Sequence, residues 1–237
     1  MAANAGIEQT TGDVVEVLND DVEVSRGWVS AALQRFSDPA VGAVTPLVLQ
    51  GPPGASAVER IDSAGDEYHL GGFARKRWHG EALAEKHLAA GFVFGANGTG
   101  SFYRRSALLE AGCFPEEFLA YFDDVDLSWR LNRAGWRIWY EPASRMHHRV
   151  SSSYGEPRGD LLALQSRNEE LVFWRNVPRW KLPIALPLHA AVLAGKALRR
   201  LREGQVTPFL RGRAQALAML RGCVGPSSAE KTRPRKR

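Results

Sequence analysis

The chain has 237 residues, of which 44% are hydrophobic and 24% charged, a composition that excludes disordered and fibrous proteins. Its two cysteines, Cys113 and Cys223, are too few for a disulfide framework and favour a reducing compartment such as the cytoplasm. The net charge of +5 is uneven, because residues 1–195 carry 19 basic against 24 acidic side chains and residues 196–237 carry 12 against 2. We therefore expect an acidic body with a basic C-terminal part that suits an anionic surface, whether lipid headgroups or nucleic acid.

The first 50 residues alternate between strand and helix signals. Residues 13–24 are rich in β-branched side chains, which predicts a strand ending at Asn19-Asp20-Asp21. Ser25 is the expected N-cap of a following helix with its apolar side chains on one face. A second strand is predicted over residues 41–49, bent or at a sheet edge because Pro46 lies inside it.

The middle of the chain gives weaker signals. Residues 55–90 carry glycines and charges without a clear period, and we expect a mobile surface loop there. Residues 91–105 have strand-like ends around a glycine-rich centre. A short helix is predicted from Ser106, which would cap it, to Ala111, with Gly112 ending it.

The segment FLAYFDDVDLSWRLNRAGWRIWYEPASRMHH, residues 118–148, combines regular elements with many charged side chains. Its apolar residues recur at helical spacing in the first half, and Gly135 stands where a helix commonly ends. The predicted order is a helix over 124–134, a strand over 136–140, a turn at Glu141-Pro142 and an extended segment over 144–148.

Beyond about residue 160 the pattern becomes helical. The run over residues 182–195 is nearly all apolar, but it contains Pro183 and Pro187 and is shorter than the roughly 20 residues of a membrane span. Basic residues follow it directly, so we expect a helix lying at a membrane surface, with a core helix as the open alternative. The expected organisation is therefore a partial domain over 1–160, a helical extension over 161–222 that the first alternative places at a membrane surface, and a disordered basic tail over 223–237.

Two acidic clusters are candidates for chemistry. Asn19-Asp20-Asp21 at a strand end would suit a hard cation bridged to phosphate oxygens, although a simple turn explains the same residues. Asp123, Asp124 and Asp126 stand at a helix N-terminus, which lowers a carboxyl pKa, whereas neighbouring carboxylates raise it. A helix cap and a catalytic base are thus equally open interpretations of the second cluster.

Aromatic and histidine side chains flank the second cluster. Tyr121 and Phe122 directly precede it and would offer a sugar ring a stacking platform. His147 and His148 point to opposite faces of an extended segment, so at most one of them serves a given site.

Together these segments resemble glycosyltransferase family 2, whose members are inverting, use nucleotide sugars and have the GT-A fold. NAGIEQTTGDVVEVLNDDVEV is similar to the family's stretch leading into its Asp-x-Asp-type metal motif. The block from GTGSFYRRS to the two histidines looks like the acceptor side, with its acidic (E/D)D-x-D pattern, and SRNEELVFWRNVPRW resembles the segment that follows. The resemblance covers roughly residues 3–180, and the rhamnosyltransferase-like members that build cell-surface polysaccharide are the most similar in pattern.

The resemblance implies a fold and a set of roles. The fold would be α/β: a truncated, Rossmann-like GT-A mixed sheet flanked by helices, with a C-terminal helical extension. Asp124 would be the general base, Asp123 and Tyr121 would contact the acceptor, and Asn19, Asp20 and Asp21 the donor. Asp21 and His148 would hold Mg²⁺ or Mn²⁺. The partners would be a nucleoside-diphosphate sugar and a glycan or lipid-linked acceptor. An anionic membrane surface would be a further partner if the chain lies at the inner face of the plasma membrane.

The chain also departs from the family pattern. Members usually carry ~60 to 90 further residues before this region, about half a typical domain, so we expect a truncated domain or a chain that depends on a partner. Ala3 stands where many members have arginine. The Gln-x-x-Arg-Trp motif of processive synthases is missing from the sequence, which predicts transfer of a single sugar.

Two other classes of function remain as rivals. One is a catalytically inactive remnant that acts as a membrane-surface or protein-binding module. The other is a nucleic-acid binder acting through the basic tail, which the acidic body and the lack of a recognisable nucleic-acid module argue against. We therefore expect no nucleic-acid partner.

Overall fold

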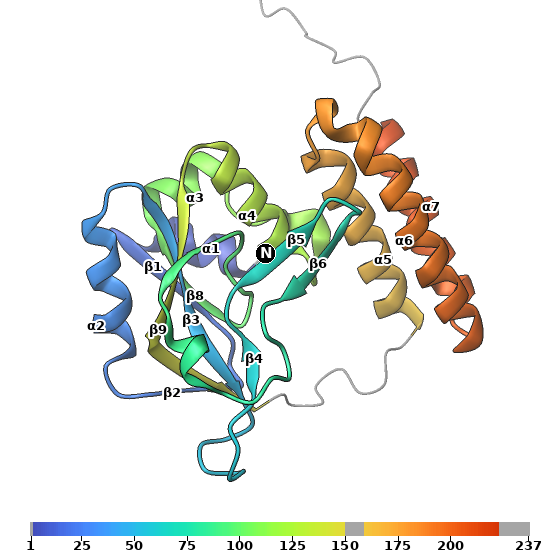
Figure 1. Ribbon diagram of the computed structural model, residues 1–237. Coiled ribbons are helices and arrows are strands. Elements are labelled where there is room, and N and C mark those ends of the chain that lie inside the picture. Colours follow the sequence, from blue (N-terminus) through green and yellow to red (C-terminus); the bar gives the residue numbers. More distant parts are fainter. Residues whose placement is uncertain (1, 150–158, 223–237) are drawn as a thin grey trace, which may run out of the picture.

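A computed structural model describes residues 2–149 and 159–222 (Figure 1). The predicted basic tail over 223–237 lies outside the described residues. The described chain forms an α/β part, residues 2–149, followed by three long helices on one side of it (Figure 1). The described residues thus comprise an α/β part followed by a helical extension.

A seven-stranded mixed sheet forms the centre of the α/β part. Its main path runs through β1 (Val14–Leu18), β8 (Gly100–Arg104), β3 (Val41–Gln50), β9 (Arg137–His148) and β2 (Val22–Val24). Two further strands extend it: β4 (Ile61–Ser63) pairs with β3, and β7 (Gly91–Val93) pairs with β9. Only the β3–β9 pair is parallel within this described sheet. The predicted mixed sheet is therefore confirmed.

Strand β3 lies in the interior of the sheet, so of the two alternatives for the strand with Pro46, bent or at an edge, the edge position is wrong. Nine of its ten residues are buried, and it pairs with β8, β9 and β4. The register with β9 shifts directly after Pro46, which accommodates the proline inside a central strand. The predicted turn at Glu141-Pro142 is also wrong, because β9 continues through both residues and absorbs them in the same irregularity.

Helices cover both faces of this sheet, because successive strand residues point to opposite sides. Ala43 is buried with the apolar side chains of α1 (Ala2–Gln9), α3 (Arg105–Ala111) and α4 (Asp123–Arg133). Val44, the next residue, is buried against α2 (Trp28–Leu33). Figure 1 shows α2 apart from the other three helices, across the sheet. The sheet therefore has an apolar core on each side.

The predicted helix ends are partly corrected. The N-cap residue of α2 is Gly27, with φ of 83°, and the helix start has no side-chain capping hydrogen bond. The predicted cap Ser25 is therefore wrong. Helix α3 begins at Arg105, one residue before the predicted cap Ser106. Gly112 does end α3, in the left-handed conformation with φ of 79° that glycine adopts without strain.

Residues 55–90 form regular structure, which contradicts the predicted mobile loop. They contain β4, the hairpin of β5 (Asp66–His69) with β6 (Phe73–Lys76), and a 3-10 turn, η2 (Glu85–Leu88). Ile61, Ala64 and His87 are fully buried. Strands of three and four residues are too short to show a hydrophobic period, which is why the sequence pattern did not reveal them.

The C-terminal extension consists of α5 (Gly159–Asn176), α6 (Leu182–Arg202) and α7 (Val206–Gly222). Helix α7 crosses α5 closely at Gly212, where a Cβ atom would lie 2.1 Å from the carbonyl oxygen of Ala163. Short 3-10 turns, η1 (Gln34–Ser37), η3 (Glu116–Phe118) and η4 (Arg179–Lys181), complete the described elements.

Helix α6 continues through Pro187 and extends to Arg202, seven residues beyond the predicted run over 182–195. The stretch Arg179–Arg202 has 24 residues, and its most apolar 18-residue window has a mean hydropathy of 1.2, so its length and composition alone would allow it to cross a membrane. Only 11% of its most apolar window is buried. The alternative of a core helix is therefore wrong.

Candidate active site

One hollow of about 790 Å³ contains all seven residues to which the family resemblance gave a role, whereas Asp126 does not line it and pairs with Arg130. These seven residues come from three separate parts of the chain: Asn19, Asp20, Asp21, Tyr121, Asp123, Asp124 and His148. Lys76, Gly98 and Phe122 also line the hollow. Two acidic clusters about 100 residues apart in the chain thus face a common space.

Strand pairing brings the first cluster to the hollow. Strand β1 ends at Leu18, and the next backbone N–H, that of Asn19, donates to the carbonyl oxygen of Thr99 at 2.9 Å. The chain then turns into β2, whose first residue, Val22, pairs with His148 at the end of β9. Asp21 therefore lies beside His148 because the strand register places it there.

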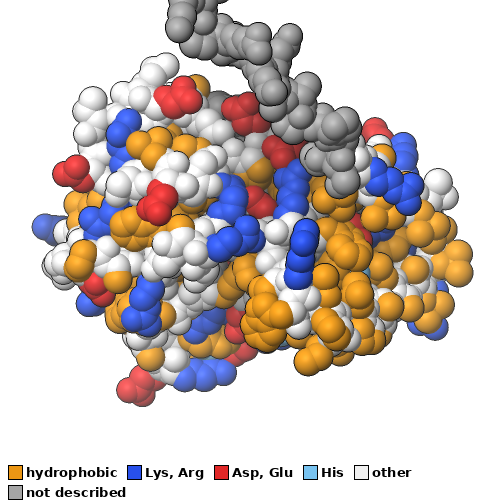
Figure 2. Space-filling view, turned by 90° about the horizontal axis from the view of Figure 1, so that it is seen from above, with side chains coloured by type: hydrophobic (Ala, Val, Ile, Leu, Met, Phe, Trp, Pro, Cys, Tyr) orange, Lys and Arg blue, Asp and Glu red, His pale blue; other side chains and the backbone are white. Residues whose placement is uncertain are grey.

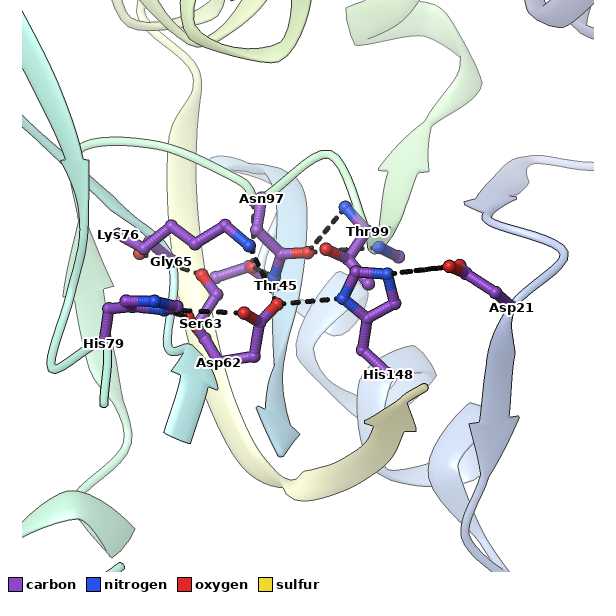
Figure 3. Close-up of polar contacts among 11 residues, drawn as sticks. Asp21, Thr45, Asp62, Ser63, Gly65, Lys76, His79, Asn97, Thr99 and His148 are labelled. Carbon is purple, nitrogen blue, oxygen red and sulfur yellow. Dashed lines mark hydrogen bonds and ion pairs between the residues drawn. The ribbon is translucent and has the colours of Figure 1, made fainter. Parts of the chain in front are cut away.

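His148 bridges two carboxylates (Figure 3). Its Nε2 lies 3.1 Å from Oδ1 of Asp21, and its Nδ1 lies 3.1 Å from Oδ2 of Asp62. The neighbouring His147 is directed elsewhere, with its Nδ1 3.3 Å from the carbonyl oxygen of Gly51. The prediction that only one of the two histidines faces the cluster is confirmed.

The charges around His148 are coupled. The hydrogen bond to Asp62 raises the pKa of His148 above its usual value, against the opposing effect of burial. Burial alone would raise the pKa of Asp62, but the hydrogen bond with His148 and the charge of Lys76 lower that pKa to about 2. The Lys76 ammonium donates to Asp62 at 2.8 Å. Asp62 is therefore a permanently charged anchor at neutral pH.

This arrangement fits a divalent cation held by two protein ligands. Nowhere in residues 2–149 and 159–222 do three His, Cys, Asp or Glu side chains form a group that could hold a metal ion. Asp62 and Asp21 face opposite nitrogens of the imidazole, so Asp62 is not placed to share an ion with the other two. Magnesium typically takes one or two protein ligands and completes its shell with water and phosphate. A histidine whose second nitrogen is fixed by a carboxylate is the usual form of a metal-ligating histidine.

Asp124 is the strongest candidate for a base. Burial, followed by the charge of Asp123, raises its pKa to about 7, although hydrogen bonds from the backbone N–H groups of Val125 and Gly98 oppose the shift. Val125 donates to Oδ1 at 2.8 Å, as expected at the start of α4. The sequence left open whether the helix N-terminus lowers this pKa or the neighbouring carboxylates raise it. In the structure the pKa is raised, mainly because the carboxyl group is desolvated.

Gly98 is fitted closely to this carboxylate. A Cβ atom at position 98 would lie 2.7 Å from Oδ2 of Asp124. Asn97, buried beneath, accepts from the N–H groups of Thr99 and Gly100 at 3.0 and 3.1 Å and donates to Thr45 at 2.6 Å (Figure 3). The glycine-rich segment is therefore a fixed wall of the hollow.

The loop before α4 has an unusual backbone. Leu119, Tyr121 and Phe122 have φ of 62°, 66° and 65°, a region that costs a non-glycine residue about 1–3 kcal/mol. The side chain of Asn168, on α5, donates to the carbonyl oxygens of Phe118, Ala120 and Tyr121 at 2.9, 2.8 and 3.0 Å. The C-terminal extension therefore holds the loop that leads into the two aspartates.

Sequence analysis missed three residues that shape the site: Asp62, Asn97 and Asn168. Asp62 lies in a strand too short to recognise, and Asn168 reaches the loop from about 50 positions away. Of these three residues, Asn97 alone could have been noticed in the sequence, because it is a polar residue inside the glycine-rich segment GANGTG.

Known proteins resemble this chain over most of its length. Residues 1–158 match the family described as glycosyltransferase like family 2. The chain is 32% identical over 222 residues to an N-acetylglucosaminyl-diphospho-decaprenol L-rhamnosyltransferase of Mycobacterium tuberculosis, covering 86% of this chain and 70% of that protein. It is 33% identical over 147 residues to a pre-mycofactocin glycosyltransferase of the same organism, covering 62% of this chain and 29% of that protein.

Solved structures share the fold. The crystal structure of GalNAc-T7 with UDP, GalNAc and Mn²⁺ matches 72% of this chain and 34% of its own chain, with a TM-score of 0.50 and 16% identity. That degree of similarity concerns the architecture, a mixed sheet flanked by helices. Together with the family match, it establishes that the chain belongs to glycosyltransferase family 2 and contains a GT-A-type α/β domain.

Proposed function

We propose that the chain transfers a single sugar from a nucleoside-diphosphate sugar to a hydroxyl group of an acceptor, with inversion at the anomeric carbon. The observation that carries this proposal is that Asp124, with its pKa of about 7, and the Asp21–His148 pair line one hollow. A base with a pKa near neutrality is best suited to remove a hydroxyl proton at physiological pH.

The reaction is a single displacement. Asp124 accepts the proton of the acceptor hydroxyl, and the oxygen forms a bond to the anomeric carbon from the face opposite the diphosphate. The bond between that carbon and the diphosphate oxygen breaks, and its electron pair leaves with the nucleoside diphosphate. Asp123 and Tyr121, beside the base, would orient the acceptor.

Asp21 and His148 would hold Mg²⁺ or Mn²⁺, with Asn19 and Asp20 next to the donor phosphates. The cation, when bound, would offset the negative charge that develops on the departing diphosphate. Asp62 fixes the orientation of His148 through Nδ1, which leaves Nε2 directed at Asp21. The Mn²⁺ and UDP in the GalNAc-T7 structure support a divalent cation in a fold of this type.

The relatives suggest the substrates. The name of the mycobacterial relative specifies L-rhamnose transfer to a lipid-linked sugar, so activated L-rhamnose is the first donor to test and a lipid-linked glycan the first acceptor class. The process served would be the synthesis of cell-surface polysaccharide or glycolipid.

Helix α6 would place the chain on the cytoplasmic face of the plasma membrane. Its apolar side chains Ile184 and Leu188 are 65% and 46% exposed, yet its other face is fixed to the domain, since the His189 ring stacks on Phe173 at 3.8 Å and its Nδ1 lies 2.9 Å from the carbonyl oxygen of Gly71. A helix bound to its domain in this way suits a position along the membrane surface. The chain should sediment with anionic vesicles. The double variant Ile184→Asp, Leu188→Asp should stay in the supernatant. Equal sedimentation of both proteins would contradict this placement.

The enzymatic proposal is tested with a panel of nucleotide sugars, including UDP, GDP and dTDP forms, by measuring nucleoside diphosphate release with and without Mn²⁺. We expect one donor to be consumed in a metal-dependent way, and Asp124→Asn to abolish that consumption while the exposed control Asp13→Asn preserves it. A folded chain that binds no nucleotide sugar would instead support the inactive remnant.

A further inference from the structure

A second cavity lies outside the catalytic hollow, among the three C-terminal helices. Its volume is about 190 Å³, several times the ~30 Å³ of one water molecule. Four cationic side chains and one carboxylate line it: Lys196, Arg199, Arg200, Arg213 and Glu169. This excess of positive charge indicates an anionic occupant.

The carboxylates nearby do not use all the donors of these cations. Glu169 contacts both Lys196 and Arg213, Glu170 accepts from Arg213 at 2.7 Å, and Glu203 accepts from Arg199 and Arg200 at 2.7 and 2.8 Å. Four cations thus share three carboxylates.

Arg213 gives the clearest sign of an unused donor. Its side chain is buried, and its Nε has no hydrogen-bond partner among the residues that the structure describes. A buried guanidinium nitrogen without an acceptor is costly and rare in folded proteins. A phosphate group has acceptor oxygens on several sides and matches the donor geometry of arginine.

The position of the cavity suggests which phosphate it binds. Phe122 lines both this cavity and the catalytic hollow, and it directly precedes Asp123 and the base Asp124. On the same helix as three of the cations, Leu198 and Leu201 are 51% and 61% exposed. Figure 2 shows hydrophobic side chains gathered over the C-terminal helices, with Lys and Arg side chains along their border with the α/β part.

We propose that this cavity binds the diphosphate of a lipid-linked acceptor, an inference that rests on the proposed function. The order along the surface is a base, an aromatic wall, a cationic cavity and an apolar face. An acceptor made of a sugar, a diphosphate and a polyprenyl chain has the same order of chemical groups. The donor diphosphate belongs in the other hollow, beside Asp21 and His148.

Binding of farnesyl diphosphate to the full chain tests this inference, by calorimetry in the presence of EDTA so that metal-dependent binding near Asp21 is suppressed. We expect farnesyl diphosphate to bind more tightly than inorganic pyrophosphate or farnesol. Lys196→Gln and Arg200→Gln should each weaken its binding by ~10-fold, the usual effect of losing a charged hydrogen bond. The matched control is Arg202→Gln, which removes an exposed cation of the same helix that does not line the cavity.

Four results would overturn the inference. If inorganic pyrophosphate binds as tightly as farnesyl diphosphate, the cavity is a site for free diphosphate. If farnesol binds as tightly, the protein recognises only the apolar chain. An equal loss in the Arg202→Gln control would indicate attraction to the general charge of the helix. Asp124→Asn should bind farnesyl diphosphate normally, so a chain that transfers no sugar still tests the cavity. Conversely, if the chain transfers sugar but Lys196→Gln and Arg200→Gln bind farnesyl diphosphate as tightly as the unmodified chain, the proposed diphosphate site is refuted and the proposed function stands.

Discussion

The α/β part and the C-terminal helices contribute to the same site in different ways. The α/β part, which the family match covers to residue 158, carries the side chains that we propose as reactive: Asp21, Asp124 and His148. The helices lie beyond that match, yet Asn168 on α5 holds the loop in front of Asp123. In the proposed mechanism the region that matches the family thus supplies the reactive groups, and the following region positions the loop that leads to them.

The largest effect is expected from the base. Asp124→Asn preserves the shape of the side chain and removes its ability to accept a proton, so sugar transfer should fall by about 10²–10⁴-fold. The apparent affinity for Mn²⁺ should stay unchanged, because Asp21 and His148 are intact. Transfer rates close to those of the unmodified chain would remove Asp124 from the mechanism.

The metal ligands and their support should come next. His148→Gln removes a proposed ligand, and Asp62→Asn removes the charge that fixes the imidazole, which typically costs 10–100-fold in metal affinity. Mn²⁺ titration followed by electron paramagnetic resonance measures both without requiring turnover. His147→Gln is the matched control, and an equal loss of Mn²⁺ affinity in this variant would contradict the assignment.

Asn168 tests whether the helical extension positions the catalytic loop. Asn168→Ala leaves three carbonyl groups without their donor, so the free energy of unfolding should fall by roughly 2–4 kcal/mol. The value of kcat should fall while Mn²⁺ affinity is retained, because the loop leads to Asp124 and not to His148. The matched control is Asn132→Ala, which also removes an amide that donates to two carbonyl oxygens, but at a place away from this loop. An unchanged kcat in Asn168→Ala would contradict the idea that the helical extension positions the loop before Asp124.

The smallest effect is expected at the helix crossing. Gly212→Ala places a methyl group where the carbonyl oxygen of Ala163 lies, so α7 must move away from α5 at a cost of about 1–3 kcal/mol. Thermal unfolding followed by circular dichroism measures this loss. Gly195→Ala on α6, where a Cβ meets no atom within 4 Å, should not destabilise the chain.

Periodicity predicted the strand that ends at Asn19-Asp20-Asp21 and the helix that begins near Asp124, and the family resemblance predicted the α/β class and named the seven candidate site residues, all of which line one hollow. They did not predict β4, β5 and β6, because strands of three or four residues show no period. They also placed a turn at Glu141-Pro142 and offered a sheet edge as one of two alternatives for the strand with Pro46, because local preference cannot foresee that two neighbouring strands share one irregularity. The pKa of Asp124 depended on burial, which only the assembled fold determines.

The dependence of kcat/KM on pH tests the central claim most directly. If Asp124 is the base, the rate should rise with pH through about 7, because the carboxyl group accepts a proton only after it has lost its own, and then remain constant. Asp123→Asn removes a charge that raises the pKa of Asp124, so it should move this rise to lower pH. A rate that does not change around neutral pH, or a rise that Asp123→Asn leaves in place, would contradict the account.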